Sequence, residues 1–211
     1  KEKNRSVRGK ANFKLSYDIL PELTLSSSFA ADYSIHRRNY FSPSYLNSNG
    51  YSISIGETGI NLMALSETLL NYKKIFWEEH SVSFLAGFSY QYDQMEYNGG
   101  NGQKSPSDKI HYVSSGFPTI TEEGYGDFKK SVALQRYQSD MTEKALISYF
   151  ARLEYNYKLK YLLSASFRQD GSSTFGSGNR WGTFPSVAAA WTFTEENFME
   201  NWSGWFNYGK V

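Results

Sequence analysis

The sequence of 211 residues has no cysteine, only 5 prolines and no excess of either charge. Without cysteine there can be no disulfide framework, thiol catalysis or Cys-based zinc site. The 22 basic and 21 acidic residues give a net charge of +1, which offers no electrostatic basis for binding nucleic acid. Apolar runs are short, and Val187-Ala-Ala-Ala-Trp191 is typical of them. A membrane helix needs about 20 apolar residues in a row. The sequence therefore predicts no disulfides, no nucleic-acid partner and no membrane helix.

Aromatic residues are abundant, with 17 Tyr, 15 Phe and 5 Trp. This load argues against a disordered chain, which would carry few aromatics and a high net charge. The sequence begins at Lys1 rather than at an initiator Met, no signal-peptide pattern follows, and residues 206–211 resemble the start of a strand. We expect the sequence to be a piece of a longer chain.

Seven stretches alternate apolar and polar residues with a period of two, which is the period of a pleated strand. From 7 to 19 the odd-numbered residues are apolar, aromatic or glycine, while the even-numbered ones from Arg8 to Asp18 are polar or charged. The other stretches are 23–35, 61–73, 80–92, 145–157, 161–170 and 185–193, of which 61–73 alternates least clearly. No helix-period stretch exceeds one or two turns. The pattern predicts an all-β fold with about seven strands.

The connections between these stretches alternate in length. Those near 20–21, 74–79 and 158–160 are short, whereas those at 36–60 and 93–143 are long. The connection at 171–182 is intermediate, and the one at 194–204 is expected to contain a helical turn. In antiparallel up-and-down strands, odd and even connections lie at opposite ends. Short turns at one end and long surface loops at the other are typical of an outer-membrane β-barrel.

A soluble β-sandwich is the alternative, with the apolar stripes facing each other in a core. Strands of globular proteins run about 5–6 residues, whereas five of the seven stretches here have 13. A sandwich also gives no reason for the long loops to share one end. The pattern favours an arc of about seven strands of a larger transmembrane barrel. Its other strands must lie outside this stretch, because open strand edges in lipid are costly.

Three segments in the last third of the sequence are distinctive. Tyr149-Phe-Ala-Arg-Leu-Glu-Tyr-Asn-Tyr157 is followed by Asp170-Gly-Ser-Ser-Thr-Phe-Gly176 and by Asn179-Arg-Trp-Gly-Thr-Phe-Pro-Ser-Val187. With these motifs the chain resembles the SusC/RagA family of TonB-dependent outer-membrane transporters of Bacteroidetes. The segment from Tyr17 to Pro21 and His80 also fit the family, whereas Thr174 stands where an Arg or Lys is common.

The resemblance implies a barrel of about 22 strands that is filled by an N-terminal plug. It implies residence in the outer membrane of a Gram-negative, Bacteroidetes-type cell, with the lipid bilayer around the barrel. It also implies energy from the inner-membrane TonB complex, a SusD-like surface lipoprotein that lids the barrel, and import of oligosaccharides or peptides. Residues 1–211 would be part of the barrel domain, without plug, signal peptide or remaining strands. The alternatives are a passive porin or structural outer-membrane barrel, and a soluble glycan-binding β-sandwich.

Aromatic residues in the two long loops are the first candidates for ligand or partner contact. They are Tyr40, Phe41 and Tyr45 in one loop, and Tyr97, Tyr112, Phe117, Tyr125 and Phe128 in the other. Such side chains can stack on sugar rings or anchor a partner protein, because they give large and rigid contact areas. They can equally form a small core within the loop itself. The sequence leaves both alternatives open.

The family motif supplies the second set of candidates, which we interpret as structural. Its members are Arg168, Asp170, Gly171, Ser172, Ser173, Phe175, Gly176, Arg180, Trp181 and Gly182. Asp170 is expected to hold the 171–182 loop through Arg180 and backbone amides, as an Asp before Gly-Ser-Ser often does. The alternative is that Arg168, Asp170 and Arg180 face substrate in the lumen.

Nothing in the sequence indicates catalysis, a cofactor or a metal. His36, His80 and His111 are far apart and lack zinc-site spacing. The glycines at 99–102 do not link a strand to a helix, so a phosphate-binding loop is not expected. No Ser, His and Asp residues stand in the context of a catalytic nucleophile. We expect a protein that is not an enzyme and holds no cofactor.

Overall fold

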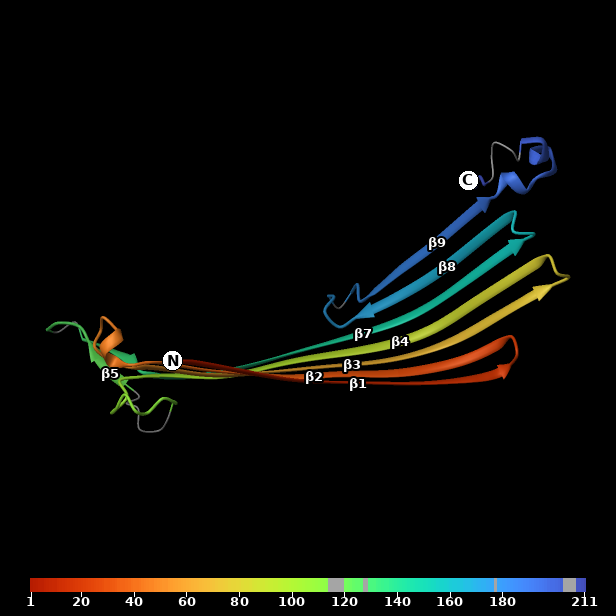
Figure 1. The fold of residues 1–211 in the computed structure, drawn as a ribbon. Coiled ribbons are helices and arrows are strands. Elements are labelled where there is room, and N and C mark those ends of the chain that lie inside the picture. The colour runs from red at the N-terminus through yellow and green to blue at the C-terminus, as the bar shows by residue number, and fades with distance from the viewer. Residues whose placement is uncertain (114–119, 127–128, 177, 203–207) are drawn as a thin grey trace. The chain divides into compact units, whose positions relative to one another are not determined.

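In a computed structural model, which describes residues 1–113, 120–126, 129–176, 178–202 and 208–211, seven long strands form one open sheet (Figure 1). Their order is β1-β2-β3-β4-β7-β8-β9, so sequence neighbours pair as antiparallel up-and-down strands. The strands are β1 (Glu2–Leu20), β2 (Leu23–Ser42), β3 (Ile53–Phe76), β4 (His80–Gln103), β7 (Gln135–Tyr157), β8 (Tyr161–Ser172) and β9 (Trp181–Trp191). A separate hairpin pairs β5 (Ile120–Glu123) with β6 (Lys130–Ala133). The predicted all-β fold with seven strands is confirmed.

Several strands are longer than the sequence pattern predicted. β2 reaches Ser42 and β3 begins at Ile53, so the loop expected at 36–60 spans only 43–52. β4 reaches Gln103 and β7 begins at Gln135, so the loop expected at 93–143 spans 104–134 and contains β5 and β6. For β4 the predicted boundary was wrong because Gln94, Glu96 and Asn98 are polar at the even positions, where the residues up to Tyr92 were mostly apolar or aromatic. Alternation ends there although the strand continues.

The short connections have the predicted positions. β3 and β4 are joined by Trp77, Glu78 and Glu79, and β7 and β8 by residues 158–160. Trp77 and Glu78 have φ values of 50° and 61°, and Lys158 and Leu159 have 52° and 58°. Positive φ at two successive residues is the conformation of the primed hairpin turns, whose twist matches that of the flanking strands.

The segment after β9 contains the 3₁₀ helices η2 (Phe193–Glu195) and η3 (Asn197–Trp202), which confirms the expected helical turn. A third 3₁₀ helix, η1 (Ser44–Leu46), follows β2. No helix in the described residues is long and apolar enough to cross a membrane.

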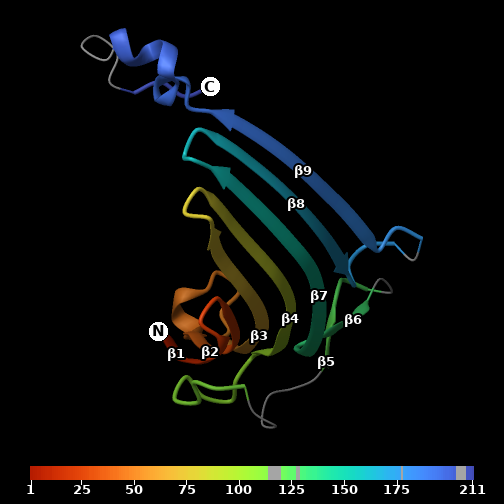
Figure 2. The same cartoon turned by 90° about the vertical axis from the view of Figure 1, so that its right-hand side faces the viewer.

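The chain divides into two compact units. Unit 1 comprises 1–11, 31–63 and 93–143, and unit 2 comprises 12–30, 64–92 and 144–211. Each of β1 to β4 and β7 contributes one end to unit 1 and the end with the short turns to unit 2. In unit 2, β7, β8 and β9 lie side by side, and the 3₁₀ helices follow the end of β9 (Figure 2).

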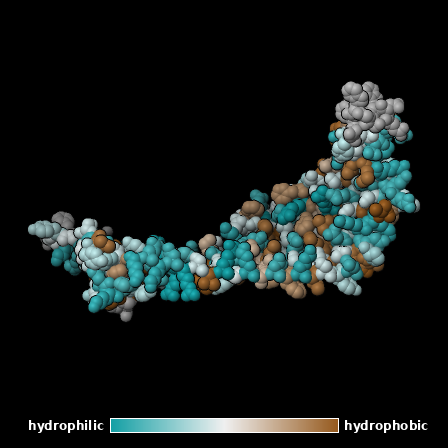
Figure 3. Space-filling model, viewed as in Figure 1, coloured by the Kyte–Doolittle hydropathy of each residue, from teal (hydrophilic) through white to brown (hydrophobic). Residues whose placement is uncertain are grey.

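The strand register in unit 2 gives the sheet two unlike faces. Leu153, Ala165 and Val187 are direct partners across β7, β8 and β9, and their neighbours Arg152, Ser166 and Ser186 are partners on the opposite face. In the space-filling view, hydrophobic surface gathers over unit 2, while the visible surface of unit 1 is largely hydrophilic (Figure 3). Within the described residues only Phe41 and Leu134 are buried hydrophobic side chains. The sheet therefore has no core of its own, and its apolar face lies open.

The open apolar face generates a prediction about β1, where Phe13 and Leu15 are 66% and 61% exposed. Phe13→Arg or Leu15→Arg in the full-length protein should destabilise the folded state by about 2–4 kcal/mol, because each would place a charge on the face that the sequence pattern predicts to meet lipid near the midplane. Denaturant titration in lipid vesicles measures the change. Lys14→Arg, on the other face, is the control and should be nearly neutral. Equal losses from both faces would contradict the assignment.

Candidate functional site

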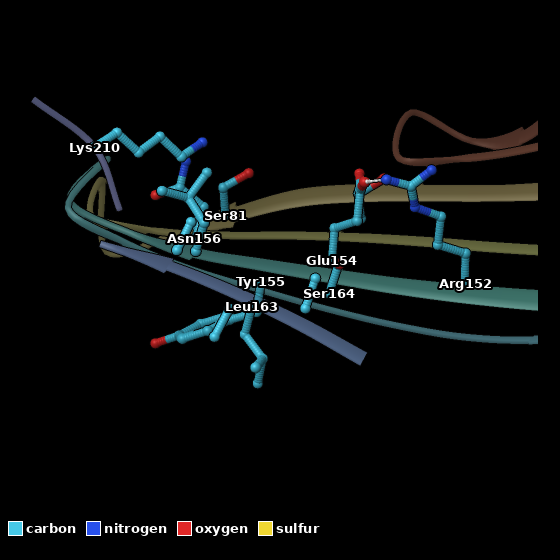
Figure 4. A pocket seen from close by; sticks show the side chains of 13 residues that line it. Ser81, Arg152, Glu154, Tyr155, Asn156, Leu163, Ser164 and Lys210 are labelled. Carbon is cyan, nitrogen blue, oxygen red and sulfur yellow. Dashed lines mark ion pairs between the residues drawn. The ribbon is translucent and has the colours of Figure 1, made fainter. Parts of the chain in front are cut away.

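The polar face of unit 2 carries a shallow hollow between β4, β7, β8 and β9. The hollow has a volume of about 440 Å³, and Arg152 and Glu154, which form an ion pair, line it. In Figure 4 these two side chains lie on the opposite side of the sheet from Tyr155 and Leu163. This is the arrangement expected of alternate residues along a strand. The hollow thus presents charged and hydroxyl groups on one face, while the other face keeps the apolar stripe.

Arg168 and Asp170 lie on the same polar face and pair with each other. The Arg168 Nε donates to both carboxylate oxygens of Asp170 at 2.9 Å, and its Nη2 donates to the fully buried Ser148 hydroxyl at 3.1 Å. The guanidinium also lies 5.5 Å from the centre of the Phe150 ring. Residues two apart on a strand share a face. Asp170 therefore pairs with its strand neighbour, and the predicted pairing with Arg180 is wrong.

Arg180 contributes its backbone instead. Its carbonyl accepts a 3.0 Å hydrogen bond from the Ser172 N–H. The Ser173 hydroxyl accepts a bond from the Ala145 N–H at 2.9 Å, and the Ser172 hydroxyl lies 2.8 Å from that of Thr174. Phe175 and Gly176 are exposed in the same connection. The motif residues between β8 and β9 thus organise the connection mainly through backbone and hydroxyl groups.

Two glycines make room for aromatic rings on opposite faces. A Cβ on Gly87 would lie 2.3 Å from the Phe150 ring, and one on Gly171 would lie 2.8 Å from the Trp181 ring. Trp181 also stacks with Tyr149, at 6.2 Å between ring centres. A ring that covers a strand glycine replaces the packing that the glycine lacks. This gives Gly171 and Trp181 of the family motif a structural role. Gly182 is similarly close to the Phe184 ring, at 3.0 Å.

A second polar cluster crosses five strands within unit 1. The Arg38 Nε donates to Glu2 at 2.8 Å, and its Nη1 donates to Glu57 at 3.3 Å. The Tyr97 hydroxyl donates to the other Glu57 oxygen at 3.2 Å and accepts a bond from the Gln138 amide at 3.4 Å. These contacts join β1, β2, β3, β4 and β7 in one line, which we call the cross-strand network. Sequence analysis missed Glu57 and Gln138, because their strands were predicted to begin only after them.

Charged pairs on β1 and β2 extend the polar surface of unit 1. Arg8 donates from Nε to Asp32 at 2.8 Å and from Nη2 at 2.5 Å, and Lys10 lies 3.4 Å from the same carboxylate. The Ser6 hydroxyl and the His36 ring are 2.8 Å apart. Fork-shaped Arg–carboxylate contacts fix both partners. Arg8 and Lys10 of the predicted even-numbered stripe of β1 therefore pair with Asp32 of β2.

The loop ends of unit 1 pack on each other. The Asp108 carboxylate accepts bonds from the Ser44 N–H at 2.9 Å and from the Ser44 hydroxyl at 2.7 Å. Phe41 is only 4% exposed, and its ring lies 4.6 Å from that of His111. These contacts join the connection after β2 to the connection after β4. Phe41, near the end of β2, thus belongs to a small core that this strand end forms with the connection after β4.

The other candidate loop aromatics differ in exposure. Tyr40 and Tyr97 are half-buried, and Tyr97 belongs to the cross-strand network. Tyr45, Tyr112 and Tyr125 are 79%, 52% and 95% exposed. Phe117 and Phe128 lie outside the described residues. Of the two alternatives, a loop core describes Phe41, whereas the three exposed tyrosines are placed where a partner could contact them.

Glu196, in the segment after β9, interacts with three side chains. Its carboxylate accepts bonds from the Tyr161 hydroxyl at 2.6 Å and from the Trp191 indole at 3.2 Å, and lies 3.7 Å from the Lys160 ammonium. The bond from Tyr161 is the main cause that holds the pKa of Glu196 below its ordinary value. No group of three metal-binding side chains occurs in the described part of the chain.

Comparison with known proteins gives consistent matches. The family model described as TonB dependent receptor-like, beta-barrel matches residues 2–211. TonB-dependent receptor P39 of Formosa agariphila is 34% identical over 190 residues, which is 89% of this chain and 17% of that protein. TonB-dependent receptor SusC of Bacteroides thetaiotaomicron is 40% identical over 96 residues, or 43% of this chain and 9% of SusC. This chain thus spans under a fifth of these relatives.

Solved structures match the fold. The RagAB peptide transporter superposes with a TM-score of 0.79 at 22% identity, over 94% of this chain and 21% of that one. The RagAB peptide importer in its open-open state gives a TM-score of 0.81 at the same identity, over 95% and 21%. At this identity the likeness concerns the fold alone. Because the matched segments are pieces of barrel wall, the sandwich alternative is wrong.

The close contact between Gly87 and the Phe150 ring leads to a prediction about stability. Gly87→Ala should lower the free energy of unfolding of the full-length protein by about 1–3 kcal/mol, because the new methyl group displaces Phe150 from beneath Arg168. Gly9→Ala is the matched control, since nothing lies within 4 Å of a Cβ there. It should be neutral or stabilising by up to about 1 kcal/mol. Denaturant titration in vesicles compares the two, and equal effects would rule out the steric role of Gly87.

Proposed function

The chain belongs to the TonB dependent receptor-like β-barrel family, and we propose that it forms part of the wall of an outer-membrane importer. In this proposal the complete transporter is energised by the TonB complex and carries oligosaccharides or peptides across the outer membrane of a Bacteroidetes-type cell. The similarity to proteins named TonB-dependent receptor and SusC supports it, as does the likeness in fold to the RagAB peptide transporter. The substrate class of those proteins enters here only as a proposal.

One observation carries the proposal: a single-layer sheet with two unlike faces. The odd-numbered stripe of β8 exposes large apolar side chains, with Leu163 at 49% and Phe167 at 47%. The opposite face of β7 and β8 carries Arg152, Glu154 and Arg168 in ion pairs. Exposed apolar surface of this extent needs a cover, and a lipid bilayer covers one side while an aqueous lumen hydrates the other.

The lengths of β3 and β4 support an extended wall. Both strands have 24 residues, whereas a membrane-spanning strand needs about 9–11. In the proposed topology the short turns lie in the periplasm and the surplus length, with the cross-strand network, rises beyond the outer leaflet. Charged side chains in that part of the strands then face water on the lumen side. In this proposal unit 1 is the part of the chain that a substrate meets first.

A SusD-like surface lipoprotein is the proposed partner at this end. Tyr112 and Tyr125 lie in the 104–134 connection and expose about half or more of their surface. Large exposed aromatics are the side chains that most often anchor protein interfaces. Asp108 binds Ser44 in the connection after β2, and His111 contacts Phe41 near the end of β2, so the part of the connection next to Tyr112 is held in place.

The topology generates a prediction that the absence of native cysteine makes easy to test. A single cysteine introduced as Asn49→Cys or Gly176→Cys should react with an impermeant maleimide on intact cells. One introduced as Glu79→Cys or Lys158→Cys should react only after the outer membrane is opened. All four positions are exposed, so accessibility within the fold is matched. The reversed labelling pattern would overturn the proposed orientation.

The partner surface generates a second prediction. The double variant Tyr112→Ser/Tyr125→Ser should reduce co-purification of the lipoprotein by about tenfold or more, because each lost aromatic anchor is expected to cost at least 1 kcal/mol. Quantitative pull-down from outer membranes measures this loss. Tyr137→Ser is the control, since Tyr137 is 73% exposed but lies on β7. Unchanged co-purification in the double variant would move the contact to Tyr45 or to another part of the protein.

A further inference from the structure

Within unit 1 the cross-strand network borders a second hollow, on one face of β3, β4 and β7. Its volume is about 190 Å³. The side chains of Ile55 and Glu57 come from β3, those of Tyr97 and Asn101 from β4, and those of Arg136 and Gln138 from β7. On each strand these are alternate positions, which is why they share a face. The hollow is thus built from strands on all sides rather than from loops.

Two glycines form the floor of this hollow. Gly99 is buried, and a Cβ there would lie 2.5 Å from the hydroxyl oxygen of Tyr97. At Gly100 a Cβ would come within 3.4 Å of the Arg136 carbonyl oxygen. The Tyr97 side chain therefore lies along the bare backbone of Gly99, with its hydroxyl bound to Glu57. Glycine permits this close approach, and the result is a flat floor next to an oriented phenol.

Some of the polar and charged side chains around the hollow have hydrogen-bond partners, and one does not. Glu57 is held by Arg38 and Tyr97, and Gln138 by Tyr97. By contrast, the Arg136 side chain has no hydrogen-bond or ion-pair partner within the described residues. Arg136 lines the same hollow and lies on the same face of β7 as Gln138. A guanidinium presents five donors in a planar fork that suits a carboxylate or sulfate group. Within the described residues the wall therefore combines a carboxylate that is already hydrogen-bonded with one guanidinium that is not.

We propose that this hollow binds one acidic sugar unit, with Arg136 on its anionic group and with Tyr97, Asn101 and Gln138 on its hydroxyl groups. The size fits one unit of an oligomer, because sites for drug-sized ligands run about 300–1,000 Å³. Amides and phenols both donate and accept hydrogen bonds, as sugar hydroxyls do. The anion is a carboxylate or a sulfate, which share this recognition chemistry.

A peptide is the less suitable ligand for this hollow. Side chains of a bound peptide need apolar cover, and Ile55 is the one aliphatic side chain in the lining of this hollow. The backbone groups of β4 are engaged within the sheet, so they are not free to pair with an added strand. The proposal rests on the proposed transport function, since it names the substrate class that this wall of the importer would contact.

The test uses the full-length transporter in detergent and isothermal titration with four probes. These are tetragalacturonate, a chondroitin sulfate tetrasaccharide, neutral cellotetraose and tetraglutamate. We expect at least one acidic tetrasaccharide to bind at least about tenfold more tightly than cellotetraose and tetraglutamate. Arg136→Gln should weaken that binding by about 10- to 100-fold, as loss of a charge-assisted hydrogen bond does, and leave cellotetraose unchanged.

Arg180→Gln is the matched control, because Arg180 is also exposed and lacks a side-chain partner in the described residues, yet lies in unit 2. It should bind like the wild type. Gly99→Ala should also weaken binding, since its methyl group displaces Tyr97. Heat-resistant migration verifies that each variant keeps its folded barrel.

Three results would overturn the site: no preference for acidic sugars, equal effects of Arg136→Gln and Arg180→Gln, or preferred binding of tetraglutamate, which would indicate a peptide site. Co-purification of the lipoprotein is measured on the same preparations. A transporter that retains its lipoprotein but shows no acidic-sugar preference refutes the site alone. Loss of the lipoprotein from the wild type would instead refute the proposed function.

Discussion

The alternation of side-chain direction along a strand is the constraint on which this structure depends. Each strand must present one row of side chains to each face of a sheet that has no second layer. Leu153, Ala165 and Val187 meet on one face because the register places them opposite each other, and Arg152 and Ser166 are then necessarily on the other. A slip of one residue would exchange the two faces of a strand, so pairing and patterning must agree along the whole sheet.

Polar groups on such a wall are held by cross-strand contacts rather than by burial. The Arg168–Asp170 pair with Ser148 in unit 2, and the line from Glu2 through Arg38 to Tyr97 in unit 1, both run across neighbouring strands. Ion pairs with half-exposed side chains add little stability individually. Their more important consequence is geometric, because they fix where charged groups point. Among the residues that line the hollow of unit 1, Arg136 has no side-chain partner within the described part of the chain, whereas Glu57 and Gln138 are both bound to Tyr97.

Much of the fold could be predicted from the sequence because strand alternation is a local signal. The seven strands, the three short turns and the helical turn after 193 were all placed correctly. The ends of the strands beyond Ile35 and Tyr92 were not. In β4 this is because residues such as Gln94, Glu96 and Asn98 are polar on the face where apolar residues were expected. Backbone pairing continues there without any alternation to mark it. The pairing of Asp170 was missed for a related reason, since the loop motif indicated a partner in the loop rather than the strand neighbour Arg168.

The sequence by itself determined which face of each strand is apolar, how many strands there are and at which end the long connections lie, because these follow from period and spacing. Only the tertiary structure decided which residues meet. Glu57 and Gln138 are 81 positions apart in number, and both bind the hydroxyl of Tyr97 from strands on either side of β4. The sequence does not distinguish Gly99 from Gly87. In the structure the ring of Tyr97, from the same strand, covers Gly99, whereas the ring of Phe150, from β7, covers Gly87. Contacts between side chains of different strands depend on strand order and register, which the pattern along one strand does not encode.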